Sequence, residues 1–160
     1  LWHVAAAQEI EKLSLILEGT LIDAEYVFEA VSDQTRYTIY QCVDAFFEGK
    51  VDRGIRIIRG LKDEGLEPVL LVWAFGRDVR ALVSLAGFVK TGLSLDKSAE
   101  KAGIWNNRRA LLSSVFQKHG YAQLVSFLRE TIYIDSIVKG ARSGSPWGAL
   151  ELLGCKIGTN

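Results

Sequence analysis

Apolar side chains recur at spacings of three and four along nearly the whole chain, which is the pattern of helices with one buried face. The first such run covers residues 2–17, and a second, which Asp23 is suited to cap, covers residues 24–31. No stretch shows a sustained alternation of apolar and polar residues between turn signals, as strands would. The pattern therefore predicts an all-α protein.

Seven further helices are predicted, and glycine or proline marks most of their ends. Gly49 stands where a left-handed residue would close a helix, Pro68 is suited to a first helical position, and Ser145 can cap a helix that Pro146 opens. The helix that begins at Pro68 is apolar on nearly every side, which predicts a central, buried position. The seven helices are expected over residues 38–48, 51–64, 68–92, 95–102, 104–118, 121–139 and from 146 onward.

A polar stretch from Ser32 to Tyr37 interrupts the apolar pattern and is interpreted as a linker. We place a domain boundary near Thr35. The prediction is two lid-like helices within residues 1–34, followed by a multi-helix bundle over residues 35–160. Helix faces as apolar as these must pack against one another.

Composition narrows the class of protein. Hydrophobic residues make up 49% of the 160 and charged residues 24%, the balance of a globular domain. Nineteen basic residues offset nineteen acidic ones, which disfavours non-specific DNA binding. No apolar run approaches the roughly 20 residues that span a bilayer. The two cysteines lie far apart, which fits a reducing compartment, and the absence of methionine suggests a segment of a longer protein.

Candidate catalytic and metal-binding residues are few. His3 and His119 lack a third ligand at metal-binding spacing, and no phosphate-binding glycine loop occurs, so no metal or cofactor is expected. His119 precedes a helix-ending glycine, which favours an interaction with a helix C-terminus. Asp135 is a conceivable buried catalytic carboxylate, although a surface pair with Lys139 four residues on is the favoured interpretation. We expect no catalytic residue.

The segment over residues 103–109, GIWNNRR, is the most distinctive. Trp105, Arg108 and Arg109 suit the centre of a protein interface, and the arginine pair could also hold an anion. The interpretation that the residues alone favour places Trp105 in the core and both arginines on the solvent face. Arg77 and Arg80 share a helix side close to tryptophan and aspartate, which predicts structural stacking or ion pairing.

Two other classes of function remain as alternatives. One is a helical nucleic-acid-binding module that uses the arginines at positions 53, 56, 59, 108 and 109. The zero net charge and the spiral of cations around residues 51–64 argue against it. The other is an all-α enzyme built around Asp135 or His119, which would need a deep pocket with perturbed acids.

The order of several segments resembles the C-terminal half of the δ subunits of bacterial DNA polymerase III, a family of clamp-loader components. The segments are residues 9–15 (EIEKLSL), 43–50 (VDAFFEGK), 61–68 (LKDEGLEP), 103–109 (GIWNNRR) and 147–153 (WGALELL). The resemblance covers almost all 160 residues. Collars of other loader subunits, δ′ or γ/τ, share the architecture and stay open as alternatives.

This resemblance implies a non-catalytic part in assembly. Residues 1–34 would be the end of an AAA+-like helical lid, and residues 35–160 would form a collar domain that joins γ/τ and δ′ into a ring. The sliding clamp would bind an N-terminal domain outside this chain, DNA would be met only by the whole complex, and the setting would be the bacterial cytoplasm. The candidate interface residues are Trp105, Arg108 and Arg109, followed by Phe46, Phe47 and Trp147.

Overall fold

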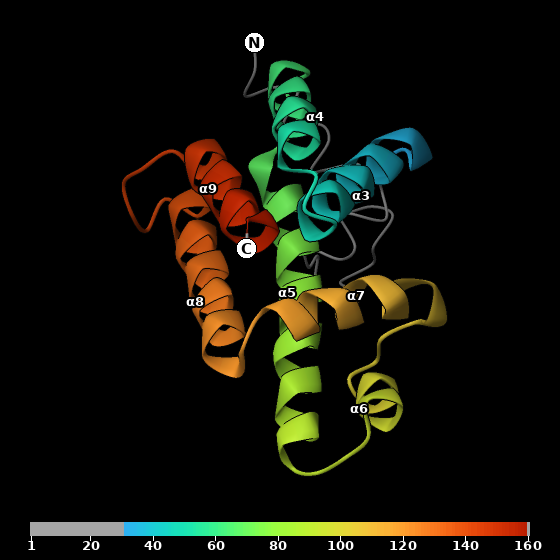
Figure 1. The fold of residues 1–160 in the computed structure, drawn as a ribbon. Coiled ribbons are helices and arrows are strands. Elements are labelled where there is room, and N and C mark those ends of the chain that lie inside the picture. Colours follow the sequence, from blue (N-terminus) through green and yellow to red (C-terminus); the bar gives the residue numbers. More distant parts are fainter. Residues whose placement is uncertain (1–30, 160) are drawn as a thin grey trace, which may run out of the picture.

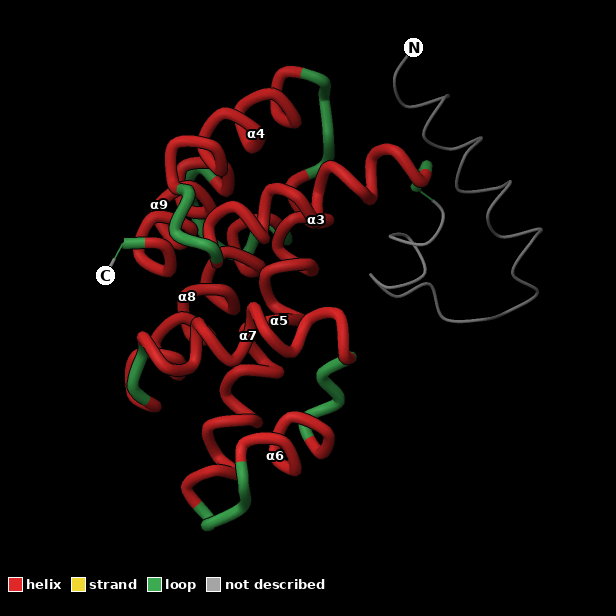
Figure 2. Tube along the Cα trace, turned by 45° about the vertical axis from the view of Figure 1, so that its right-hand side comes forward, coloured by secondary structure: helices red, strands yellow, loops and turns green. Residues whose placement is uncertain are grey.

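The computed structural model describes residues 31–159, and within this range the chain is helical, with no strand (Figures 1 and 2). The prediction of an all-α fold is thereby confirmed. The two helices predicted before residue 31 lie outside the described residues. The described helices are α3 (Asp33–Phe47), α4 (Val51–Asp63), α5 (Pro68–Lys90), α6 (Leu95–Lys101), α7 (Asn106–Lys118), α8 (Tyr121–Val138) and α9 (Pro146–Gly158).

Serine hydroxyls begin three of these helices. Ser32 accepts from the backbone N–H of Thr35 at 3.3 Å, and Ser145 accepts from that of Gly148 at 3.3 Å. Ser94 caps α6 in the same way. Each hydroxyl satisfies an amide that a helix N-terminus leaves without a partner.

Three predicted boundaries needed correction by two residues or more, and one of them is the end of α5, which lies at Lys90 instead of near residue 92. α3 begins at Asp33 and not at residue 38, so residues 33–37, interpreted as a linker, form the first turns of the helix. The local reason is that Ser32 caps the helix and that Asp33, in its first turn, interacts favourably with the positive end of the helix dipole. α7 begins at Asn106, two residues later than predicted. The domain boundary near Thr35 stays a prediction.

α5 runs through the centre of the molecule, and the other helices surround it (Figure 1). Its 23 residues correspond to about 35 Å of helix, and 11 of them are buried. α8 packs along it on one side, while α3 and α7 cross it on another. α4 and α6 lie at opposite ends of the molecule in both views (Figures 1 and 2).

Phe46 of α3 joins three neighbouring helices at the core. Its ring lies 6.0 Å from that of Phe75 on α5, centroid to centroid. Gly54 of α4 and Gly154 of α9 also face this ring, and a Cβ on either glycine would come within 2.7 Å of it. The two helices can approach Phe46 this closely only because both positions lack a side chain.

The α3–α4 turn depends on one glycine. Gly49 has a φ of +78°, and its N–H donates to Phe46 O while that of Lys50 donates to Ala45 O. The left-handed residue predicted at Gly49 is thereby confirmed, and the two hydrogen bonds form the pattern of a Schellman helix end.

None of the described helices is both long enough and apolar enough to cross a membrane.

Candidate functional site

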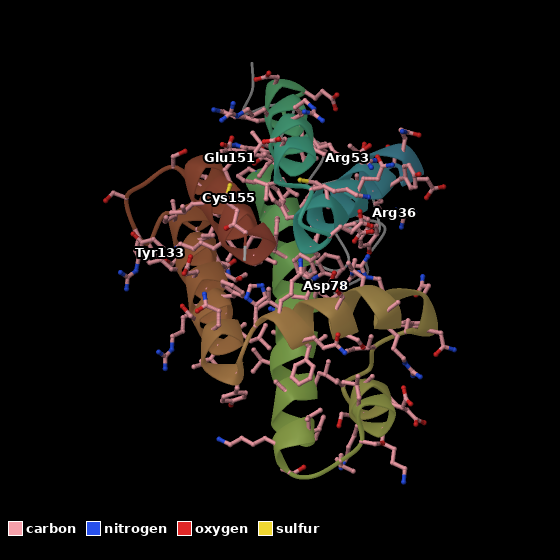
Figure 3. All side chains as sticks on the ribbon, viewed as in Figure 1. Arg36, Arg53, Asp78, Tyr133, Glu151 and Cys155 are labelled. Atoms are coloured by element: carbon pink, nitrogen blue, oxygen red, sulfur yellow. The ribbon has the colours of Figure 1, made fainter. Side chains whose placement is uncertain are left out.

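A buried aspartate, Asp78, lies where α5 meets α3 and α7 (Figure 3). Asp78 of α5 is only 3% exposed. Its Oδ1 accepts from Nε and Nη2 of Arg77 at 2.9 and 2.8 Å, and its Oδ2 accepts from Nη2 of Arg108 on α7. The second terminal nitrogen of Arg108 donates to Asp44 of α3. Two carboxylates and two guanidinium groups thus neutralise one another where three helices meet.

The pKa of Arg108 reflects this environment. Burial by itself would lower the pKa of the guanidinium, but the charges of Asp78 and Asp44, together with one hydrogen bond to each, raise the pKa above its ordinary value. The side chain is 16% exposed. Arg108 is therefore a charged, largely buried group that links the helices.

Two aromatic rings enclose Arg77. Its guanidinium carbon lies 4.8 Å from the ring centroid of Tyr40 and 5.5 Å from that of Trp73. Its Nη1 also donates to the Tyr40 hydroxyl at 2.7 Å. The stacking or ion-pairing role predicted for Arg77 and Arg80 is confirmed for Arg77, which makes both kinds of contact. Arg80 makes neither kind of contact among the described residues.

The ion pairs form the floor of a cleft between α3, α5 and the start of α7. The cleft encloses about 720 Å³, and Arg80, Ser84 and Trp105 are among the residues that line it. Trp105 is 81% exposed at the N-cap of α7, whereas the preceding Ile104 is 5% exposed. The chain therefore buries Ile104 and leaves the indole outside.

The favoured interpretation of the GIWNNRR segment was wrong. It placed the tryptophan in the core and both arginines on the solvent face, whereas Trp105 is exposed and Arg108 is largely buried. Arg109 is half-buried, and its Nε is buried without a hydrogen-bond partner in the described structure. Of this trio, Trp105 has the most accessible side chain.

The secondary interface candidates are less accessible. Phe46 and Phe47 are 0% and 1% exposed and belong to the core, so their candidacy as surface residues is corrected. Both rings pack against Phe75 of α5, the second at 6.2 Å between centroids. Trp147 is half-buried and packs against the same core. Apolar residues on a helix face are buried first by the chain's own helices.

The histidine and aspartate candidates have structural partners. His119 is buried, its Nε2 lies 3.0 Å from Ile157 O, and its ring meets Phe127 edge-on at 5.0 Å. A carbonyl oxygen only accepts, so Nε2 carries the proton. His119 thus interacts with a helix C-terminus, as predicted, but the helix is α9 and not α7. Asp135 pairs with Lys139 at 2.6 Å, as favoured. His3 lies outside the described residues.

No group of three or more metal-ligating side chains occurs among residues 31–159. The five arginines that a nucleic-acid-binding module would use do not form one continuous basic surface, because two of them are held in ion pairs. Arg59 pairs with Glu151 of α9 through two hydrogen bonds, of 3.1 and 3.0 Å, and Arg108 is held by two aspartates. Arg53 (Figure 3) and Arg56 are both exposed on α4.

Sequence reasoning missed two members of the site, Asp44 and Tyr40. A signal for the aspartates was present: Asp44 and Asp78 both interrupt apolar helical runs whose neighbours are buried. An acid on such a face needs a cation nearby. Which cation supplies the charge is not evident from the sequence.

Comparisons with known proteins agree on one family. A family model described as "Processivity clamp loader gamma complex DNA pol III C-term" matches residues 39–158. The chain is 27% identical over 162 residues to "DNA polymerase III subunit delta" of Haemophilus influenzae, covering 96% of this chain and 47% of that protein. It is 29% identical over 148 residues to the protein of the same name from Escherichia coli K12, covering 92% and 43%. The chain thus spans less than half the length of these relatives.

Proposed function

The chain belongs to the family of clamp-loader γ-complex DNA polymerase III C-terminal regions, and on this premise we propose that it is the assembly region of a δ subunit. Its role is to hold the clamp loader together while the sliding clamp is opened and loaded onto DNA. The observation that carries the proposal is the family match over residues 39–158, which spans nearly all of α3 to α9.

The packing supports a structural role. The charged side chains at the junction of α3, α5 and α7 are used to join helices, as Asp78 and Arg108 illustrate. The large exposed apolar side chains are different, because no helix of the described chain covers them. They are Tyr37, Trp105, Tyr121, Ile132, Tyr133 and Leu152. Such residues are typical of protein interfaces.

The proposed partners follow the family. Residues 35–160 form the collar and contact the γ/τ and δ′ subunits, while residues 1–34 end an AAA+-like lid. The sliding clamp binds a different part of the subunit, DNA is contacted only by the assembled loader, and the complex acts in the bacterial cytoplasm. The subunit is accessory to the polymerase and performs no catalysis in this region.

The test is reconstitution from purified components. The 160-residue chain is mixed with γ/τ and δ′ and analysed by size-exclusion chromatography with light scattering at micromolar concentrations. Co-elution as a defined complex is expected. Separate elution at every ratio, together with tight DNA binding by the chain alone that weakens steeply with salt, would instead favour a nucleic-acid-binding module.

A further inference from the structure

Two hollows meet at Arg80. The first is the cleft between α3, α5 and α7, with Trp105 at its edge. The second is a groove of about 240 Å³ between α5 and α8, which Trp73, Ile132 and Asp135 help to line. Arg80 lines both, so the hollows form one continuous surface across α5. We call it the Arg80 surface, defined by Trp105, Tyr40, Trp73, Arg80 and Ile132.

The acids that line the two hollows are already neutralised by cations of the same chain. Asp78 is paired with Arg77 and Arg108, and Asp44 with Arg108. In the groove, Asp135 is paired with Lys139.

One cation is left over on this surface. Arg80 is exposed and makes no ion pair with any residue of the described chain. Its Nη1 lies close to Gly76, 3.0 Å from where a Cβ would be, so the guanidinium lies along its own helix. What the surface offers a partner is therefore one positive charge at its centre.

Apolar side chains flank this charge on either side. Trp105 is 81% exposed in the cleft, and Ile132 is 60% exposed in the groove. Tryptophan and arginine are the residues most often found at the energetic centres of interfaces. An arginine between apolar anchors matches a segment with one carboxylate between apolar side chains.

We propose that the Arg80 surface binds an acidic segment of a neighbouring clamp-loader subunit, with a carboxylate on Arg80 and apolar side chains over Trp105 and Ile132. The proposal rests on the proposed function and names the surface and the chemistry through which that assembly occurs. A nucleic acid fits less well, because three aspartates line the two hollows and only one cation among the lining residues is uncompensated.

The experiment measures the affinity of the full 160-residue chain for the γ/τ–δ′ assembly by titration calorimetry at 50 and 300 mM NaCl. Trp105→Ala and Arg80→Glu test the surface. Arg53→Glu is the matched control, because it makes the same charge change at an exposed position of α4 that lines neither hollow. Far-UV circular dichroism of each variant checks that the helices remain.

Trp105→Ala and Arg80→Glu are each expected to weaken binding about tenfold or more, while Arg53→Glu changes it less than about twofold. Arg80→Glu is also expected to reduce the salt dependence of binding, because its charge pairs with the partner.

Three results would overturn the proposal. If the wild-type chain binds but neither surface variant weakens binding, another face makes the contact, while the assembly function stands. If Arg53→Glu weakens binding as much as Arg80→Glu, a general electrostatic attraction explains the effect. If the wild-type chain does not bind the subunits at all, both the assembly function and this surface are wrong.

Discussion

At the scale of single residues, the most consequential side chain is the carboxylate of Asp78. It is 3% exposed and accepts three hydrogen bonds from two guanidinium groups, Arg77 and Arg108. If Asp78 loses its charge, the largely buried guanidinium of Arg108 keeps only one charged partner, Asp44. A buried ion that loses its partner destabilises the fold far more than an exposed one.

Asp78→Asn is accordingly expected to lower the free energy of unfolding by about 3–5 kcal/mol, measured by urea denaturation. The matched control is Asp135→Asn, which breaks an exposed pair with Lys139 and should cost only about 0.3–0.5 kcal/mol. Equal losses in the two variants would show that the Asp78 cluster contributes no more than a surface pair.

The two cysteines are expected to differ in reactivity. Burial raises the pKa of the Cys42 thiol from 9.0 to about 12, whereas Cys155 is half-buried. Because the thiolate is the nucleophile, iodoacetamide at pH 8 should modify Cys155 and leave Cys42 intact until urea unfolds the chain. Peptide mass spectrometry measures this, and modification of Cys42 in the folded protein at a comparable rate would contradict it.

The same thiol predicts a pH dependence of stability. In the unfolded chain Cys42 loses its proton from about pH 9 upward, while in the folded chain it keeps the proton until about pH 12. The unfolded state therefore binds fewer protons in this window, and the free energy of unfolding falls by about 1.4 kcal/mol per pH unit through this group. Cys42→Ala should remove that part of the slope in urea titrations between pH 9 and 11. Identical slopes would refute it.

At the scale of elements, glycines set how closely α4 and α9 approach α3. Gly54 of α4 and Gly154 of α9 both face the Phe46 ring, which is fully buried. A methyl group at either position would come within 2.7 Å of the ring, which is packed in the core with 0% exposure. Gly60, on the same helix as Gly54, has open space at its Cβ position.

Two glycine-to-alanine changes on α4 are expected to change the free energy of unfolding in opposite directions. Gly54→Ala should destabilise by about 1–3 kcal/mol through overpacking. Gly60→Ala should stabilise by about 0.4–1 kcal/mol, because alanine restricts the unfolded chain and favours helix. Thermal denaturation of both variants measures this. The double variant Gly54→Ala/Phe46→Leu should lose less stability than the sum of the losses in the two single variants. Strict additivity of the losses would show that residues 54 and 46 do not touch.

At the scale of the whole molecule, one hydrophobic core connects the helices. The buried cluster draws residues from α3 through α9, and Trp73 of α5 and Trp147 of α9 both pack against it. Helices that share one core lose their packing together, so the described region should unfold as a single cooperative unit.

Two variants with a single tryptophan test this cooperativity. In one, only Trp73 remains, and in the other only Trp147, with the other three tryptophans replaced by phenylalanine. Fluorescence within each variant is expected to give the same urea midpoint as circular dichroism at 222 nm. Midpoints that differ reproducibly between the two signals in either variant would show that α5 and α9 belong to separate folding units.

The sequence by itself determined the helices, because their ends are encoded locally. Ser94, Ser145 and Gly49 act on amides and carbonyls only a few residues away, so their effects can be derived from spacing alone. Even the one large error in this respect, the start of α3, has a local cause in the Ser32 cap.

Only the tertiary structure decided which side chains form the site. Arg108 is buried because Asp44 and Asp78, 64 and 30 residues earlier in the chain, bring their charges to it. Trp105 stays outside because Ile104 occupies the core position beside it. The burial of a charge depends on distant partners, and a helical period does not encode which helices meet. Arg80, among the residues that line the two hollows, is the cation that no such partner reaches.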